Sequence, residues 1–270
     1  MLRLSEQKLV ASRMALGSIP KGKMLINTIN AHSYNVAQKD EAFAKALDTS
    51  WENVNDNGNV NDNVNPNLNE GWKYLIPDGG SIVKACRWLR AKSLPKERIA
   101  GWDLFAFEMQ RQNEKGESGK GKCRVMFMGS SEKVLGLIRE RAAEDYPNLE
   151  VVTYSPPYRA MFSDKENQEI IEAINTARPD LLWIGMTAPK QEKWTYEHWK
   201  ELDVDCHVGT IGAVFDFYAG TARRAPLWMQ AHSLEWFYRL MVEPKRMWRR
   251  YMIGNPLFIW NIMKEKRYGK

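Results

Sequence analysis

Cysteine is scarce in this sequence, and the few cysteines that occur are far apart. Cys86, Cys123 and Cys206 form no CxxC pair, and their number is odd. A disulfide framework needs several paired cysteines, and a structural zinc site needs closely spaced ones. We therefore expect neither, and the pattern favours a protein of a reducing, cytoplasmic compartment.

Long apolar runs are also missing. No segment approaches the roughly 18–20 consecutive apolar residues that a transmembrane helix requires. The basic start, residues 1–23, has no apolar core ending in a small-residue cleavage site. We expect a chain that is neither exported by a standard signal nor integrated into a bilayer.

Acidic residues are few near the end of the chain, so the positive charge is concentrated there. Residues 221–270 hold eleven Lys and Arg against Glu235, Glu243 and Glu265, a net charge of +8, whereas the whole chain carries +6. Aromatic rings among these cations suit the surface of an anionic membrane, and they suit nucleic acid as well. Four tryptophans lie in this segment: Trp228, Trp236, Trp248 and Trp260.

Apolar, strand-like runs alternate along the sequence with segments that have a helical pattern. The strand-like runs cover residues 24–29, 74–76, 124–128, 151–154, 181–185 and 206–209. The helical patterns cover residues 40–47, 81–92, 132–141, 167–176 and 189–202. Strands separated by helices form a mainly parallel sheet with helices on both faces. We predict an α/β, Rossmann-like domain in residues 1–225 and a basic, aromatic helical appendage in residues 226–270.

Two hydrophilic stretches interrupt this pattern. Residues 51–70 are crowded with asparagine, which favours turns over sheet ladders, and we interpret them as an inserted loop. We interpret residues 109–122 as a solvated linker between two parts of the sheet. Gly116, Gly121 and Lys122 imitate the spacing of a phosphate loop, but Cys123 replaces its Ser or Thr, and the segment precedes a strand instead of following one.

Polar and glycine-rich clusters follow five of the predicted strands. In open α/β sheets, ligands bind outside the carboxyl ends of the strands, so these clusters are expected to form one pocket. They are residues 28–32, 77–80, 129–131, 185–192 and 209–212. We assign Gly129, Gly185 and Gly209 to the binding of a nucleotide in this pocket.

Asp78 is the candidate general base of the pocket. An acceptor oxygen that attacks an electrophilic carbon must lose a proton, and a carboxylate accepts it more effectively when burial raises its pKa above about 3.9. The competing interpretation is a tight Pro-Asp-Gly-Gly turn in which Asp78 caps the next helix, and spacing alone favours that turn.

The most specific pattern lies toward the end of the chain. Its segments are residues 208–220 (VGTIGAVFDFYAG), 224–226 (RAP), 234–240 (LEWFYRL) and 243–251 (EPKRMWRRY). Further segments are Thr28 with Asn30, and residues 77–79 (PDG), 98–104 (RIAGWDL) and 188–192 (APKQE). Together, over residues 24–256, they strongly resemble the WecG/TagA/CpsF glycosyltransferase family, which makes teichoic acid linkage units, enterobacterial common antigen and capsular or exopolysaccharides.

The resemblance implies an inverting transfer of a sugar, typically N-acetylmannosamine, from a UDP-sugar to an undecaprenyl-diphosphate-linked sugar at the inner face of the plasma membrane. It implies a catalytic role for Asp78 and no cofactor. It also implies a C-terminal tail that closes over the site and docks on the membrane, with a shift between monomer and homo-oligomer. The substrate-binding residues that it implies are Thr28, Asn30, Arg98, Gln191, Arg239, Arg246 and Arg249, the last three for the acceptor diphosphate.

The charge pattern supports the arginines independently. Guanidinium groups bind phosphate oxygens bidentately, and Arg246 lies three and four positions before Arg249 and Arg250, on one helical face. Such cations can replace a metal ion at a diphosphate. Asp203 and Asp205 have the spacing with which many sugar transferases hold a divalent metal, but they equally suit a solvated turn. We predict no essential metal.

Two other functions stay open at this point. The same fold would serve a different donor, such as a uronic acid or another hexose. A non-enzymatic module would instead use the basic tail to bind RNA or anionic lipid. UDP release that depends on a lipid-linked acceptor would identify the enzyme, and salt-sensitive RNA binding without turnover would identify the module. We expect the enzyme, with no nucleic-acid partner.

Overall fold

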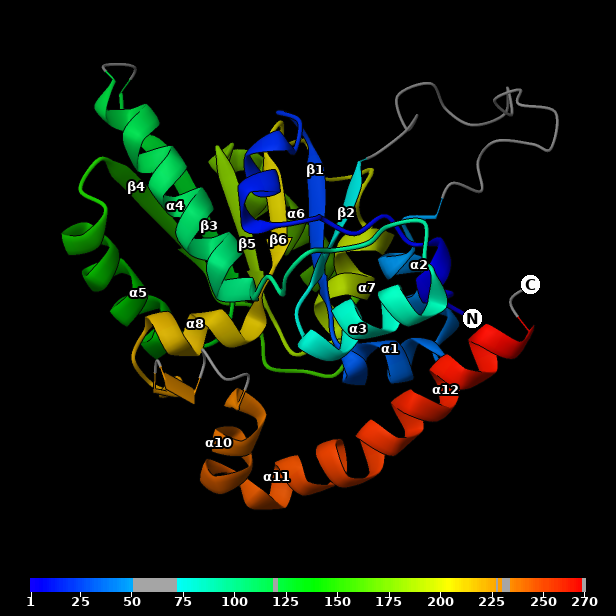
Figure 1. Cartoon of the computed structure of the whole chain (residues 1–270). Coiled ribbons are helices and arrows are strands. Elements are labelled where there is room, and N and C mark those ends of the chain that lie inside the picture. The colour runs from blue at the N-terminus through cyan, green and yellow to red at the C-terminus, as the bar shows by residue number, and fades with distance from the viewer. Residues whose placement is uncertain (51–71, 119–120, 227, 230–233, 269–270) are drawn as a thin grey trace, which may run out of the picture.

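A parallel sheet of six strands organises the chain (Figure 1). The computed structural model describes residues 1–50, 72–118, 121–226, 228–229 and 234–268. The strands follow the order β2-β1-β6-β5-β3-β4, and each neighbouring pair is parallel. They are β1 (Met24–Ile29), β2 (Lys73–Pro77), β3 (Cys123–Gly129), β4 (Leu149–Tyr154), β5 (Leu181–Gly185) and β6 (His207–Thr210).

The central strands are buried on both faces. In β3, Val125 and Phe127 pack into the core on one face, and Met126 and Met128 pack into the core on the other. All four side chains are at most 1% exposed. Alternate side chains of a strand point to opposite faces, so a strand covered on both sides is a continuous apolar run.

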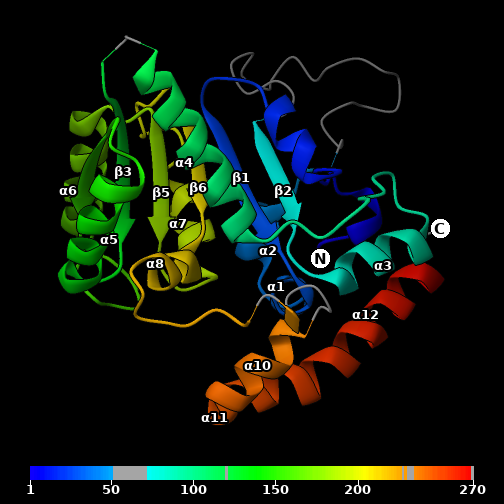
Figure 2. The ribbon, with the colours of Figure 1, turned by 60° about the vertical axis from the view of Figure 1, so that its left-hand side comes forward.

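Helices cover the two faces of the sheet (Figures 1 and 2). On one face lie α4 (Gly101–Glu117), α5 (Glu132–Asp145) and α8 (Gly212–Tyr218). On the other lie α6 (Asp164–Ala177) and α7 (Lys190–Glu197). A third core joins β1 and β2 to α1 (Ala31–Ala37), α2 (Glu41–Leu47) and α3 (Gly80–Leu89). Two 3-10 helices, Leu4–Glu6 and Arg13–Ser18, precede β1. The predicted Rossmann-like α/β fold is thereby confirmed.

The C-terminal segment crosses the carboxyl edge of the sheet and then returns along the body (Figures 1 and 2). It consists of α10 (Glu235–Val242), α11 (Pro244–Trp248), the π-helical turn Arg249–Ile253 and α12 (Gly254–Tyr268). None of the eight side chains of α10 is buried. This helix is therefore held near the sheet by contacts other than a packed core.

The last helix, α12, is firmly joined to the body. Phe258 is 6% exposed and meets the ring of Tyr34 edge to face, with 5.5 Å between the ring centroids. The Glu265 carboxylate accepts hydrogen bonds from the backbone N–H groups of Leu4 and Ser5 and from the Tyr34 hydroxyl, at 3.0, 2.7 and 2.6 Å. These contacts fix the far end of the C-terminal segment against the start of the chain.

One predicted boundary is wrong. Residues 109–117 of the predicted linker belong to α4, a single helix of 17 residues. Its apolar side chains Leu104, Phe105 and Met109 are at most 1% exposed in the core, and most of the polar residues that suggested a linker lie on its outer face, although Gln112 is buried. The many polar residues at the end of α4 obscured the helical periodicity of its apolar side chains. The asparagine-rich stretch 51–70 lies outside the described residues, and the division at residue 225 stays a prediction.

Candidate active site

Asp78 lies where β2 ends, beside the end of β1. Ile29 is paired with Pro77 in the sheet register, so the residues that follow the two strands are neighbours. The Asp78 N–H donates to the Ile29 carbonyl oxygen at 2.8 Å, and this bond fixes the backbone of the candidate base. The carboxyl edge of the sheet thus brings Asp78 next to Asn30.

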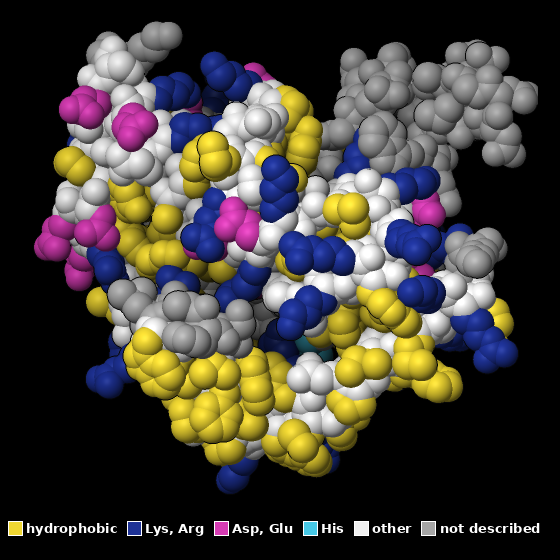
Figure 3. All heavy atoms as spheres, in the orientation of Figure 1, with side chains coloured by type: hydrophobic (Ala, Val, Ile, Leu, Met, Phe, Trp, Pro, Cys, Tyr) yellow, Lys and Arg dark blue, Asp and Glu magenta, His cyan; other side chains and the backbone are white. Residues whose placement is uncertain are grey.

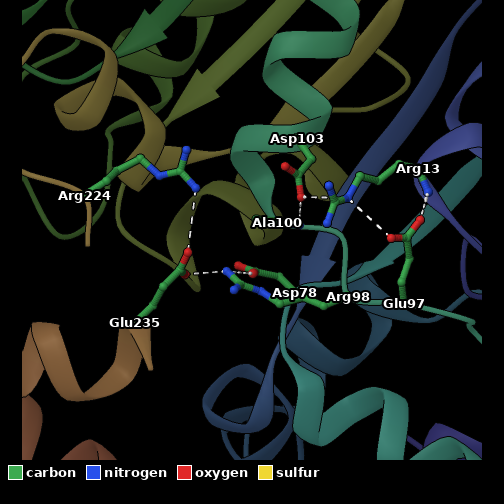
Figure 4. A network of polar contacts seen from close by, with 8 residues as sticks. All are labelled: Arg13, Asp78, Glu97, Arg98, Ala100, Asp103, Arg224 and Glu235. Carbon is green, nitrogen blue, oxygen red and sulfur yellow. Dashed lines mark hydrogen bonds and ion pairs between the residues drawn. The ribbon is translucent and has the colours of Figure 1, made fainter. Parts of the chain in front are cut away.

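The Asp78 carboxylate is directed to an arginine and not to the next helix (Figure 4). Its Oδ1 lies 3.4 Å from Arg98 Nη2, and 28% of its side chain is exposed. The N-cap residue of α3 is Gly79, which has no side chain to cap the helix, so the capping interpretation of Asp78 is not realised. Burial raises the pKa of Asp78, while the positive charges of Arg98 and Arg239 oppose this shift.

A chain of ion pairs continues from Arg98 into the C-terminal segment (Figure 4). Arg98 Nη2 lies 2.5 Å from Glu235 Oε2, and Arg224 Nη2 lies 3.7 Å from Glu235 Oε1. The Arg224 guanidinium also lies 4.8 Å from the centre of the Trp102 ring. Neither Arg224 nor Glu235 was predicted as a site residue, although the resembling segments contain both.

The loop that carries Arg98 is held on both sides. Asp103 Oδ2 accepts the backbone N–H of Ala100 at 2.8 Å, which caps the start of α4. Arg13 lies 3.7 Å from Asp103 and 3.6 Å from Glu97, and its backbone N–H donates to Glu97 (Figure 4). These contacts position the arginine beside Asp78.

Thr28 and Asn30 lie at the end of β1, and both are partly exposed. Asn30 Oδ1 accepts the backbone N–H groups of His32 and Ser33 at 3.0 and 3.1 Å and so caps α1. Arg250 Nη2 lies 3.5 Å from the same oxygen. Asn30 therefore connects the first strand of the site to the C-terminal segment.

Gln191 is buried and acts within the protein frame. Its Oε1 accepts the backbone N–H groups of Met186 and Gly212 at 3.2 and 3.1 Å, which ties the loop after β5 to the loop after β6. Its Nε2 donates to Glu192 Oε1 at 2.8 Å. Glu192 is 2% exposed, and burial raises its pKa to about 7. The structure gives Gln191 a role in holding the loops that border the site.

The three glycines assigned to nucleotide binding lie in the sheet itself. A Cβ on Gly209 would lie 2.2 Å from the Trp183 ring, and a Cβ on Gly185 would lie 2.5 Å from the Phe215 ring. Gly129 pairs with Gly185 in the register, at the end of β3. Close packing of aromatic rings explains the glycines at 185 and 209, and contact with a nucleotide stays a prediction.

The predicted arginines of the C-terminal segment are only partly brought together. The charge of Arg239 opposes the rise that burial causes in the pKa of Asp78, and its guanidinium lies 5.2 Å from the Phe217 ring centre. Arg249 is exposed and lies over Trp248, whereas Arg250 reaches Asn30. The side chain of Arg246 is outside the part of the chain that the structure describes.

A local change of helix type separates Arg246, in α11, from Arg249 and Arg250. The two arginines open the π-helical turn Arg249–Ile253, where hydrogen bonds span five residues instead of four. The α-helical spacing used to place Arg246, Arg249 and Arg250 on one face does not hold across such a turn. Burial, followed by the charge of Arg250, lowers the pKa of His32 to about 4, which places this arginine at the edge of the site.

The alternative metal motif lies elsewhere. Asp203 and Asp205 precede β6 and so lie at the amino edge of the sheet, opposite Asp78. Among residues 1–50, 72–118, 121–226, 228–229 and 234–268, no group of three or more His, Cys, Asp or Glu side chains is arranged to hold a metal ion.

Hydrophobic side chains gather on the outer surface of the C-terminal segment (Figure 3). Figure 3 also shows a hollow between this segment and the body, in which Lys and Arg side chains are visible. Within the described part of the chain, no helix combines the length and apolarity needed to span a membrane. We call the hydrophobic surface of the C-terminal segment the tail face. It comprises Trp236, Phe237, Met241, Val242, Trp248, Met252, Ile253, Ile259, Trp260 and Met263, each 42–65% exposed.

Comparison with known proteins identifies the family of this chain. Residues 62–270 match the Glycosyl transferase WecG/TagA/CpsF family. The N-acetylglucosaminyldiphosphoundecaprenol N-acetyl-beta-D-mannosaminyltransferase of Bacillus spizizenii is 31% identical over 194 residues, 72% of this chain and 69% of the relative. Enzymes of the same name from Bacillus subtilis and Staphylococcus aureus are 29% and 28% identical, covering 73% and 72% of this chain and 71% and 70% of their own lengths. This chain is therefore a glycosyltransferase that belongs to the WecG/TagA/CpsF family.

Proposed function

We propose that this glycosyltransferase moves a sugar of the N-acetylmannosamine type from a UDP-sugar to an undecaprenyl-diphosphate-linked sugar, in the synthesis of a bacterial cell-surface polysaccharide. The observation that carries the proposal is the arrangement of Asp78 and Arg98 at the carboxyl edge of the sheet, with Glu235 and Arg224 beside them. The names of the three relatives, which specify an N-acetylglucosaminyldiphosphoundecaprenol acceptor, support the same substrate class.

The chemistry proposed for Asp78 is that of a general base. The acceptor hydroxyl gives its proton to the Asp78 carboxylate while its oxygen bonds to the anomeric carbon, and the bond from that carbon to the UDP oxygen breaks. Attack from the side opposite UDP inverts the anomeric centre. Burial, which raises the pKa of Asp78, makes the carboxylate a stronger base than an exposed one. A positioned base contributes about 10²–10⁴ in rate.

The arginines supply the positive charge that the reaction needs. UDP leaves with additional negative charge on its diphosphate, and guanidinium groups stabilise such charge by paired hydrogen bonds. Arg98, Arg224 and Arg239 all lie in the electrostatic neighbourhood of Asp78 or Glu235. We propose that they replace a divalent metal, so turnover should persist in EDTA. Activity restored only by added Mn²⁺ would contradict this.

The tail face is proposed to dock the enzyme on the anionic inner face of the plasma membrane. In α10, Glu235 is directed to Arg98, whereas Trp236, Phe237 and Met241 are exposed on the outer surface. Aromatic and apolar side chains enter the interfacial region of a bilayer, and neighbouring Lys and Arg attract anionic headgroups. Docking in this way would bring a lipid-linked diphosphate to the hollow beneath α10.

The direct test is UDP release with a short-chain lipid-diphosphate sugar as the acceptor. A panel of UDP-sugars is supplied, and the product is identified by mass spectrometry. Wild type should release UDP only when the acceptor is present. Asp78→Asn should bind UDP-sugar as wild type does but lose turnover by at least about 10²-fold, while Asp205→Asn, at the opposite edge of the sheet, should retain activity. Full turnover by Asp78→Asn would refute the assigned base, and absence of acceptor-dependent UDP release with every donor would refute the function.

A further inference from the structure

Glu235 stands between two arginines at the centre of the site. Its Oε2 lies 2.5 Å from Arg98 Nη2, and its Oε1 lies 3.7 Å from Arg224 Nη2. Each oxygen of one carboxylate therefore faces a different guanidinium group (Figure 4). Only 19% of its side chain is exposed, so solvent screens these contacts less than it screens surface ion pairs.

The Glu235 carboxylate lies where an anionic ligand of Arg98 and Arg224 would bind. Arg98 also faces Asp78 at 3.4 Å, and Arg239 acts on Asp78 and on Arg224. Three guanidinium groups thus surround two carboxylates, one of which comes from the C-terminal segment. Arginines that are fully free would repel one another, and a carboxylate between them removes that repulsion. Paired guanidinium groups at such spacing bind phosphate oxygens as readily as carboxylate oxygens.

The shallow packing of α10 gives this contact a second consequence. No side chain of α10 is buried, and Glu235 is the first residue of the helix. The ion pairs of Glu235 are therefore a principal attachment of the start of α10 to the body. If an anion displaces the carboxylate from Arg98 and Arg224, the start of α10 loses that attachment.

We propose that the Glu235 carboxylate is an internal substitute for a substrate diphosphate: it holds Arg98 and Arg224 in place before substrate binds and yields them to the diphosphate when substrate binds. The inference rests on the proposed function, because that function supplies the diphosphate. Glu235 is then a positioning residue that competes with substrate for the two arginines. Binding of a diphosphate releases the start of α10.

The experiment measures binding of metal-free inorganic pyrophosphate by isothermal titration calorimetry. Glu235→Gln keeps the shape of the side chain but removes its charge, so pyrophosphate should bind at least about tenfold more tightly, a change of about 1.4 kcal/mol. Glu235→Asp, which keeps the charge, should bind it much as wild type does. Glu243→Gln makes the same charge change at an exposed position of the same segment and should leave affinity unchanged.

The outcomes separate the inference from its alternatives. Equal or weaker binding by Glu235→Gln would overturn it, as would an equal gain in Glu243→Gln, which would show a general effect of net charge. Failure of both wild type and Glu235→Gln to bind pyrophosphate would also overturn it. Circular dichroism and thermal unfolding confirm that each variant is folded before it is titrated.

Two further ligands identify the source of the diphosphate. UDP and farnesyl diphosphate are titrated against the same variants, and the ligand whose affinity rises in Glu235→Gln is the one that replaces the carboxylate. These titrations need no turnover. A gain in diphosphate affinity together with no acceptor-dependent UDP release would sustain the role of Glu235 while refuting the proposed function, so the two failures are distinguishable.

Discussion

Replacement of Glu265 by glutamine tests how the C-terminal segment is anchored. The carboxylate accepts three hydrogen bonds, from the backbone N–H groups of Leu4 and Ser5 and from the Tyr34 hydroxyl. In Glu265→Gln, one oxygen becomes an NH₂ group that faces at least one of these donors, and the remaining bonds lose their charge assistance. Hydrogen bonds to charged groups contribute about 1.5–3 kcal/mol each and neutral ones about 0.5–1.5 kcal/mol, so replacing three charged bonds by two neutral ones should lower the free energy of unfolding by about 3.5–6 kcal/mol.

The assay is urea unfolding followed by circular dichroism, with the free energy extrapolated to zero denaturant. Glu169→Gln is the matched control, because Glu169 is 50% exposed and its 3.8 Å ion pair with Lys165 lies on the surface of α6. Such a pair contributes less than about 1 kcal/mol. Glu265→Gln should also make α12 more sensitive to limited proteolysis. A loss no larger than that of Glu169→Gln, with α12 still protected, would refute the anchoring role.

Three further predictions follow from the site and the tail face. The pKa of Asp78 is raised by burial, so kcat/KM should fall as pH decreases through a value above the ordinary aspartate range; a profile that stays flat down to pH 4 would contradict this. Burial raises the pKa of Glu192 to about 7, against about 4.3 in the unfolded chain, so the free energy of unfolding should decline as pH rises between these two values. Glu192→Gln should therefore be more stable than wild type by up to about 3 kcal/mol at pH 8 but not at pH 4. Trp236→Ser with Trp260→Ser should weaken binding to phosphatidylglycerol vesicles by about tenfold or more without loss of turnover on a water-soluble acceptor, whereas Tyr158→Ser, at a fully exposed ring outside the tail, should change neither.

The strands could be predicted because burial on both faces leaves a direct mark on the sequence. Val125, Met126, Phe127 and Met128 are consecutive apolar residues, and such a short run is typical of a strand that is covered on both faces. The helix α4 was missed because its outer face is polar over its last turns, although Met109 remains buried. A helical pattern anchored on few apolar residues is easily mistaken for a loop.

The site was predictable where it follows from the sheet and less so where it depends on distant contacts. Asp78 and Asn30 come directly after neighbouring strands, so topology brings them together. The pairing of Arg98 with Glu235 joins residues 137 positions apart, and no local pattern indicates it. The contact of Arg250, and not Arg249, with Asn30 occurs within a π-helical turn, and the spacing of the arginines in the sequence does not indicate such a turn.

The two surfaces of α10 have a consequence for how this enzyme can be modified. Its first residue, Glu235, is ion-paired inside the site, while Trp236, next along the chain, is exposed on the surface proposed to meet lipid. A rigid helix advances by about 100° per residue, so a rotation of α10 that moves the Trp236 indole also moves the Glu235 carboxylate relative to its guanidinium partners. On the proposed docking, the depth to which Trp236 enters the lipid and the pairing of Glu235 with Arg98 would therefore change together.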